Sequence, residues 1–314
     1  MPLDHYVSQV HLKNFYSPAL DNLMFAMRKS DLKEFQCRSQ DVCRIEEGST
    51  NKYLTEPREV EDFLENVEPK YNAAVSNFRK GNYDVESIHA LSGFIAYITC
   101  CSPTALRINI VPLETMLVET AKVLDAQGII EKAPEALGNK TMTELLKEGT
   151  VKFDVDPKYP QAVGISNIIE RVSIYGNAHW EILFNNTDSP YLTSDFPAAI
   201  EPLVDEANMR RIVPLAPDIA VRITPDIKMR GKTDLKFGNF SAIRTSANRH
   251  EVVELNRTIV QCAEETVFFR DNHAWIPNLI KRNQDFRIDS VVRMIPHGNK
   301  SLPVPSQRIM HSKK

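Results

Sequence analysis

An alternation of apolar and polar side chains opens the chain and predicts its first strand. From residue 5 to residue 12, a mostly apolar set alternates with a polar set that includes His5 and Gln9. A period of two is typical of a β-strand. The polar face either lines a pocket or faces solvent. Residues 23–28 and 32–37 are two further β-like runs, and the short polar segment between them predicts a hairpin.

A helical period dominates the next part of the chain. Apolar residues recur every three or four positions in residues 59–79, 85–101 and 104–127, and this spacing predicts three helices. Pro69 and Pro112 lie inside the first and the third segment, so we expect a kink or a new start at each. A shorter amphipathic piece ends at Glu148, and residues 59–148 together form a helical subregion.

The second half of the chain returns to β-like runs, which Asn, Asp and Pro residues divide. These runs cover residues 179–184, 191–193, 211–215 and 220–223, and a helical period then covers residues 252–269. We therefore predict an α+β fold, in which a helical layer packs on a mixed or antiparallel sheet that joins N-terminal and C-terminal strands. Residues 1–295 form a single domain. Residues 296–314, which carry Gly, Ser and Pro, form a basic, flexible tail.

Three polar residues, Thr193, Ser194 and Asp195, stand together at the end of a predicted strand, directly before Phe196 and Pro197. Pro197 cannot donate to a strand ladder and favours an extended Phe196, so the three side chains are placed to reach a cleft. Asp195 is a candidate general base, metal ligand or histidine partner. The alternative is that Ser194 and Asp195 accept hydrogen bonds from backbone N–H groups at a turn.

His5 and Asn256 are the other candidates for chemistry. Histidine can act as an acid, a base or a ligand, or it can be an ordinary surface or core residue. Asn256 lies inside a predicted helix, where it either points at a polar site or bonds a neighbouring loop. These two residues and Asp195 would form a catalytic set if the fold brought them together, with Gln9, Thr193 and Ser194 as ligand-binding neighbours.

The charge of the chain is uneven. Its formal net charge is −3 over 314 residues, which favours neither nucleic acid nor membrane for the chain as a whole. From Arg270 to Lys314, however, nine Lys or Arg residues stand against three Asp residues. This basic C-terminal segment either binds the phosphates of a nucleic acid or is a solvated surface. Arg244, Arg249 and Arg257 could meet an anion together with it.

Composition and absent motifs narrow the class of protein. Hydrophobic residues make up 42% and charged residues 25% of the chain, as in soluble globular proteins. The sequence lacks a secretory signal pattern or a long apolar stretch, so no membrane partner is expected. Its five cysteines have no framework spacing, which favours reduced thiols and a cytoplasmic setting. Glycine-rich phosphate loops and paired-histidine motifs are absent, so we predict no metal site and leave the cofactor unknown.

The order of several short motifs resembles the bacterial family known as domain of unknown function 4238. The family's opening His-aromatic-Val-Pro pattern reads His5-Tyr6-Val7-Ser8 here, with a serine in place of the proline. Its Thr-Ser-Asp-x-Pro signature begins at Thr193, and its Leu-Asn pair ends at Asn256. The arginine that ends the family's second helix is replaced by Cys101. The resemblance covers residues 5–270 and implies the layout, but it implies no activity.

Two functions are consistent with these residues. In the first, a polar cleft binds an unidentified ligand or partner without changing it. In the second, a hydrolase or nuclease acts on a phosphate-containing substrate, with His5 and Asp195 in its site and the basic C-terminal segment near the phosphates. A ligand that stabilises the protein without being consumed would distinguish the first function from the second.

Overall fold

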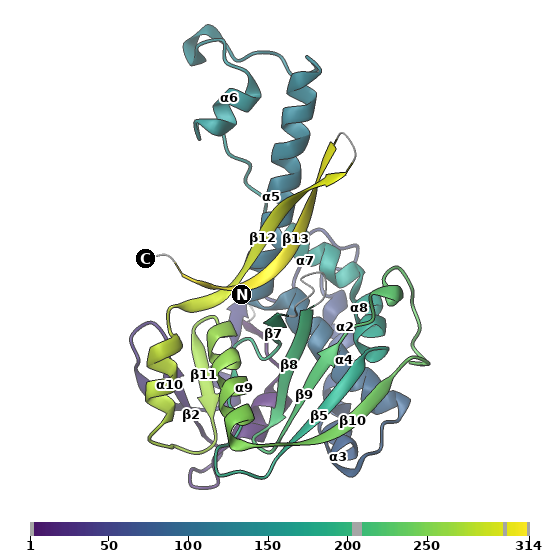
Figure 1. Cartoon of the computed structure of the whole chain (residues 1–314), viewed down its shortest axis with the longest axis vertical. Helices are drawn as coiled ribbons and strands as arrows, with labels where there is room; N and C mark the ends of the chain where they lie inside the picture. Colours follow the sequence, from purple (N-terminus) through teal and green to yellow (C-terminus); the bar gives the residue numbers. More distant parts are fainter. Residues whose placement is uncertain (1–2, 203–208, 298–299, 313–314) are drawn as a thin grey trace.

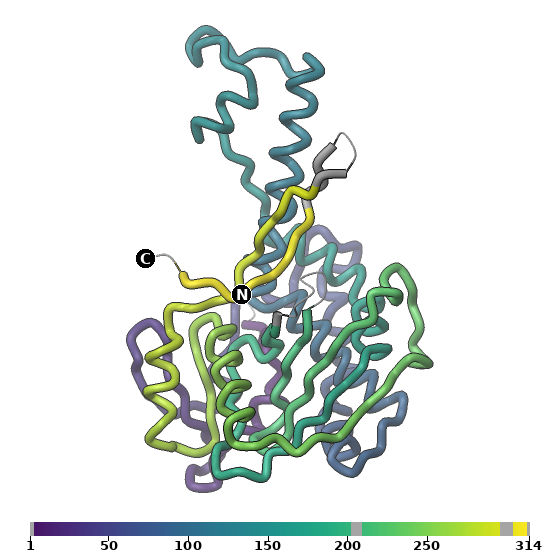
Figure 2. The backbone as a smooth tube through the Cα atoms, viewed as in Figure 1, coloured from purple at the N-terminus to yellow at the C-terminus, as the bar shows by residue number. Residues whose placement is uncertain are grey.

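The computed structural model describes residues 3–202, 209–297 and 300–312. The chain runs from short N-terminal strands through a block of helices into a sheet-rich second half, and it ends in a long two-stranded ribbon (Figure 1). The sheets and most helices form one body. The helix α5 (Pro103–Ala126) and the ribbon project from this body, as the backbone trace in Figure 2 shows.

The helical block expected for residues 59–148 is present. Within it, α2 (Glu59–Val67) ends in a 3-10 turn that contains Pro69, and α3 (Tyr71–Lys80) begins directly after this turn. The chain therefore starts a new helix at this proline, as predicted. By contrast, α5 continues through Pro112 without ending. The block closes with the short α6 (Met142–Lys147).

The helix α4 (Val85–Cys101) is the centre of the helical layer and is buried on most of its surface. It begins at Asp84, whose carboxylate accepts a hydrogen bond from the backbone N–H of Ser87 at 2.7 Å. It packs against α3, α5 and the two helices that follow the block, α7 (Lys158–Ser166) and α8 (Ile168–Gly176). Within the described residues, no helix taken alone is long and apolar enough to cross a membrane; α4 and α5 pass that test only as a pair bent by 61°.

A five-stranded mixed sheet forms the larger layer of the second half. Its order is β10-β5-β9-β8-β7, and only β10 and β5 are parallel. The strands are β5 (His179–Asn185), β7 (Ala199–Pro202), β8 (Met209–Ala216), β9 (Ile219–Thr224) and β10 (Ser241–Ala247). Strand β10 was not expected, because its side chains are mostly exposed and give no apolar run.

A second, antiparallel sheet joins the two ends of the chain. Its order is β3-β2-β11-β6, with two strands from the N-terminal region and two from the second half. They are β2 (Met24–Arg28), β3 (Glu34–Cys37), β6 (Thr193–Ser194) and β11 (Thr266–Phe269). The predicted α+β fold, with a sheet that unites N-terminal and C-terminal strands, is therefore confirmed. One large buried cluster links both sheets to the helices.

The N-terminus differs from the single strand expected over residues 5–12. Only β1 (Leu3–His5) is extended, and it pairs with β4 (Arg44–Glu46). The chain then turns into α1 (Gln9–Leu12) and a 3-10 turn that ends at Phe15. The residues that this segment buries completely are Val7, His11, Leu12 and Phe15. Positions 7, 11, 12 and 15 lie on one face of a helix. The burial of this face therefore determines the local structure, and the alternation of apolar and polar residues does not.

The C-terminal region differs in two places. The helix expected over residues 252–269 ends early, because α9 (Arg249–Cys262) is followed by β11. After α10 (Ile276–Asn283), the flexible tail expected from residue 296 is a strand in the described residues: β13 (Lys300–His311) pairs along its length with β12 (Phe286–His297). Prolines such as Pro305 suggested a loop. A two-stranded ribbon has two free edges, however, and a residue without an N–H is tolerated there.

Candidate functional site

The side chains of Thr193 and Ser194 are completely buried and serve contacts within the protein. The hydroxyl of Thr193 lies 2.9 Å from Nε2 of His11. The hydroxyl of Ser194 accepts a hydrogen bond from the backbone N–H of Phe196 at 3.2 Å. These two predicted ligand-binding residues therefore have their polar atoms engaged inside the fold.

Asp195 holds the turn between α9 and β11. Its carboxylate accepts hydrogen bonds from the backbone N–H groups of Glu264, Glu265 and Thr266 at 2.9, 2.7 and 2.9 Å. Burial raises the pKa of Asp195 to about 6, and the three N–H groups and the Lys29 ammonium act in the opposite direction. These contacts are those of the turn-capping alternative.

Lys29 supports the same turn from its other side. Its ammonium donates to the backbone carbonyl of Ala263 at 2.6 Å and to that of Phe286, at the start of the ribbon, at 2.7 Å. Burial lowers the pKa of Lys29 to about 8. The ammonium thus satisfies a carbonyl at the C-terminal end of α9, and the Asp195 carboxylate satisfies the N–H donors of the turn that follows.

Asn256 is buried inside α9 and bonds the segment that leads into β6. Its amide oxygen accepts a hydrogen bond from the backbone N–H of Leu192 at 2.9 Å, and its amide nitrogen donates to the carbonyl of Pro190 at 2.9 Å. Both ends of the side chain are therefore occupied. Of the two alternatives for this residue, the contacts match the bond to a neighbouring loop.

His5 and Gln9 lie beside the 3-10 turn at residues 39–41. The amide oxygen of Gln9 accepts a long hydrogen bond from the hydroxyl of Ser39 at 3.4 Å. The carbonyl of His5 accepts a 2.6 Å bond from the Tyr97 hydroxyl. Nε2 of His5 is buried without a hydrogen-bond partner in the described part of the chain, and burial lowers the pKa of this imidazole.

Asp195 lines a cavity of about 310 Å³, and neither His5 nor Asn256 is among the residues that line it. Its lining brings Asp195 together with Tyr6, Cys43 and Thr266. The N-terminal segment therefore approaches Asp195 through Tyr6. In the parts of the chain that the structure describes, no cluster of three or more His, Cys, Asp or Glu side chains is placed to hold a metal ion.

His11 belongs to the polar set of residues 5–12 that was predicted to line a pocket or face solvent, and it is completely buried. Its Nδ1 lies 2.8 Å from the Tyr71 hydroxyl, its Nε2 contacts Thr193, and its ring stacks on Phe94 at 4.8 Å. Burial lowers the pKa of His11 to about 3, so the imidazole is neutral at physiological pH. His11 therefore joins α1, α3, α4 and β6 through one uncharged ring.

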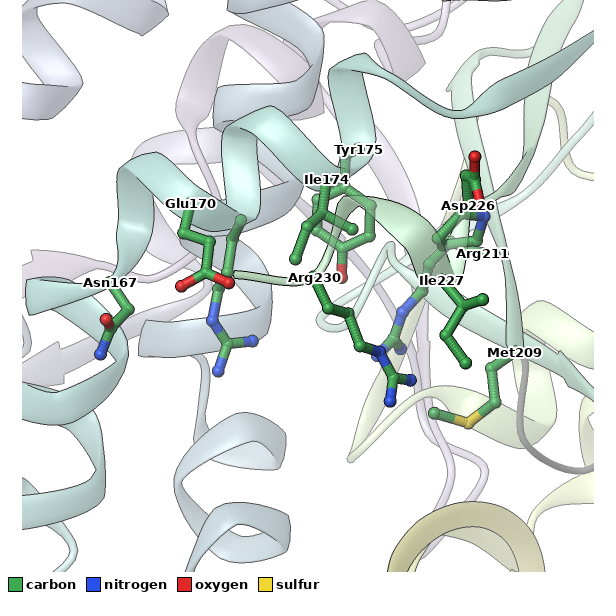
Figure 3. Close-up of a pocket in the computed structure, with 11 residues that line it drawn as sticks. Asn167, Glu170, Ile174, Tyr175, Met209, Arg211, Asp226, Ile227 and Arg230 are labelled. Atoms are coloured by element: carbon green, nitrogen blue, oxygen red, sulfur yellow. The ribbon is translucent and has the colours of Figure 1, made fainter. Parts of the chain in front are cut away.

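A separate cavity of about 500 Å³ gathers three arginines (Figure 3). Arg171 comes from α8, Arg211 from β8, and Arg230 from the loop just after the 3-10 turn at Ile227–Met229. Figure 3 shows the side chain of Arg230 extending into the space between α8 and Met209. The remaining wall is largely apolar and includes Ile174, Tyr175, Met209, Pro225 and Ile227.

Both carboxylates in this wall already have backbone partners. Glu170 accepts a hydrogen bond from the N–H of Gly231 at 2.9 Å, and Asp226 accepts one from the N–H of Lys228 at 2.9 Å. Within residues 3–202, 209–297 and 300–312, no ion pair involves any of the three pocket arginines. Three arginines against two carboxylates leave the described lining with a formal charge of +1.

The arginines named from the sequence have other roles. Arg244 lies over the Phe184 ring and donates to the carbonyl of Arg79. Arg249 pairs with Asp188, and Arg257 pairs with Glu254. Arg211 could have been noticed in the sequence, because it directly precedes the apolar residues Ile212 and Val213. An arginine at the start of a buried strand needs polar partners, and this need can indicate a site.

The comparison with protein families decides the family. The model described as "Protein of unknown function (DUF4238)" matches residues 4–273. The chain belongs to this family. The matched region of the DUF4238 family includes Asp195, Asn256 and the three pocket arginines, and it ends before the ribbon β12–β13. No curated protein and no solved structure matches the chain.

Proposed function

We propose that the protein binds a small oxyanion ligand, bearing phosphate or carboxylate groups, in the arginine pocket. The observation that carries this proposal is the convergence of Arg171, Arg211 and Arg230 on one cavity, where they outnumber the two carboxylates of the lining. Guanidinium groups present planar, paired N–H donors that match phosphate and carboxylate oxygens. Partly enclosed arginines attract such anions more strongly than fully solvated ones do.

The charge of the pocket supports an anionic ligand. The three arginines exceed the two carboxylates of the lining by one charge, and Glu170 and Asp226 each accept a hydrogen bond from a backbone N–H. Arg211 is only 6% exposed, and its two hydrogen bonds to neutral acceptors leave its charge uncompensated. A bound anion would supply that compensation.

The apolar part of the wall supports a ligand with an organic body. Tyr175 and Met209 flank the arginines, and the cavity of about 500 Å³ has room for more than a single phosphate ion. Pockets of this size, mostly apolar with a few convergent polar groups, are typical of small-molecule sites. The polar cleft predicted around Thr193 receives less support, because its side chains are engaged by the protein.

The test is calorimetric titration of the full chain with inorganic phosphate, pyrophosphate, AMP, ATP and citrate. Arg230→Gln is expected to raise the Kd of the binding anions about tenfold, since a charge-assisted hydrogen bond is lost. Arg230 is exposed and makes no ion pair in the described residues, so the fold should be retained. Arg282→Gln, an exposed arginine of α10, is the matched control and should leave the Kd unchanged.

Two outcomes would overturn the proposal. Equal affinities for wild type and Arg230→Gln would move the site elsewhere, and an absence of heat with every anion would remove it. Incubation of the nucleotides, with and without Mg²⁺, followed by a phosphate-release assay, tests the hydrolase alternative in the same samples. Binding without release supports a binding protein, whereas release would replace this function with hydrolysis.

A further inference from the structure

We infer that Gln307 of the C-terminal ribbon positions Arg211 for anion binding, so that the ribbon completes the arginine pocket. The inference rests on the proposed function. Gln307 lies on β13, outside the region that the family model matches. Its amide oxygen accepts a 2.8 Å hydrogen bond from Nη2 of Arg211. The other terminal nitrogen, Nη1, donates to the carbonyl of Ala198 at 3.2 Å.

These two acceptors set the orientation of the guanidinium. A buried arginine with one fixed contact can still rotate about its side-chain bonds, and a second contact on the other terminal nitrogen restricts that rotation. Both acceptors are neutral, so they direct Arg211 without cancelling its charge. An oriented cation loses less entropy when an anion binds, which increases the affinity.

The ribbon is seated firmly enough to serve as a support. Arg107 of α5 donates to the carbonyl of Ile288 at 2.9 Å and to the Asp289 carboxylate at 2.8 Å. The same guanidinium also pairs with Glu264 at 2.7 Å. Ile288 is completely buried in the large core cluster. The base of β12 is therefore tied to the body on the side where Asp195 holds the turn.

A connected set of contacts thus runs from the family signature to the pocket. Asp195 holds the backbone of residues 264–266, and Glu264 in this turn pairs with Arg107. Arg107 holds β12, and β13 carries Gln307 to Arg211. Gln307 is accordingly a positioning residue, because it acts on the ligand only through Arg211.

The test is a double-mutant cycle with pyrophosphate as the titrant. Gln307→Leu removes the acceptor at similar size and is expected to raise the Kd about fivefold. It should also lower the melting temperature, because a donor of the buried Arg211 loses its partner. In an Arg211→Lys background, Gln307→Leu should cause no further loss, because the residue through which it acts is already altered. In an Arg230→Gln background, Gln307→Leu should still raise the Kd. Ser306→Ala, which removes a hydrogen bond within the ribbon, is the control and should leave the Kd unchanged.

The failures of the two proposals can be told apart. If Arg230→Gln weakens binding and Gln307→Leu does not, the ribbon plays no part and only this inference is wrong. The same holds if the effects of Gln307→Leu and Arg211→Lys simply add, because Gln307 would then act without Arg211. If Arg230→Gln and Gln307→Leu both leave the Kd unchanged, the pocket itself is not the anion site.

Discussion

His11 shows how a single residue can link distant parts of this chain. Its ring is completely buried, and both nitrogens meet hydroxyl groups, on Tyr71 and Thr193. A neutral imidazole can donate from one nitrogen and accept at the other, which suits two hydroxyl partners. A protonated ring would bring an uncompensated charge into the core, and this explains why its pKa is lowered to about 3.

Acidification should therefore destabilise the protein through His11. The pKa of this residue is about 3 in the folded state and about 6.5 in the unfolded state. Below pH 6.5 only the unfolded chain takes up the proton, so stability contributed by the neutral ring is lost as the pH falls from about 6.5 toward 3. Between pH 7 and pH 5 this loss is about 2 kcal/mol.

Urea unfolding at pH 7 and pH 5 measures this contribution. His11→Gln should be less stable than wild type at pH 7. Between pH 7 and pH 5, its free energy of unfolding should fall by about 2 kcal/mol less than that of wild type. His250→Gln alters an exposed histidine and should retain the wild-type pH dependence. Identical pH dependence in wild type and His11→Gln would show that His11 can be protonated in the folded protein.

At the scale of elements, the turn between α9 and β11 connects the helical and sheet layers. Three successive N–H groups, from Glu264 to Thr266, converge on the Asp195 carboxylate. Removal of this acceptor would leave buried donors unpaired, and each such loss has a large effect. The family signature at residues 193–197 thus has a direct structural use.

Asp195→Ala is expected to lower the free energy of unfolding by about 3 kcal/mol or more, because three charge-assisted hydrogen bonds are lost together. Chemical denaturation of wild type and variant gives this difference. Asp21→Ala, which removes an exposed carboxylate whose bond is to its neighbour Asn22, should change the stability little. An Asp195→Ala protein as stable as wild type would contradict the role of this carboxylate in the turn.

The elements that could be predicted from sequence are those with local signals. The cap at Asp84 and the break at Pro69 mark helix ends through chemistry within a few residues. The early end of α9 lacked such a signal, because the apolar residues of β11 continue the helical pattern. The ribbon was not predicted, because β12 and β13 are stabilised by pairing with each other and this pairing leaves no local signal. Taken alone, the prolines of β13 suggest a loop.

At the scale of the whole molecule, the arginine pocket depends on contacts that no local pattern encodes. Arg171 lies on a helix, Arg211 on a strand, and Arg230 in a loop, and their convergence follows from how α8 packs beside the five-stranded sheet. By contrast, Thr193, Ser194 and Asp195 are adjacent in sequence and easily noticed. Their proximity made them candidates for a site, although burial directs their polar atoms into the fold.

At the scale of the whole shape, the ribbon runs along the projecting α5 (Figure 1). The ribbon packs against α5, and β13 also contacts β7. Through Gln307 it reaches the pocket. The proposed ligand site is therefore built from the matched family region and from the segment that follows it.

The most direct test of the anion site is a crystal structure of the full chain with pyrophosphate. The arrangement of Arg171, Arg211 and Arg230 predicts pyrophosphate in their shared cavity, with oxygens within hydrogen-bond distance of at least two guanidinium groups. Pyrophosphate bound at another site, with this cavity empty at a saturating concentration, would contradict the proposed function.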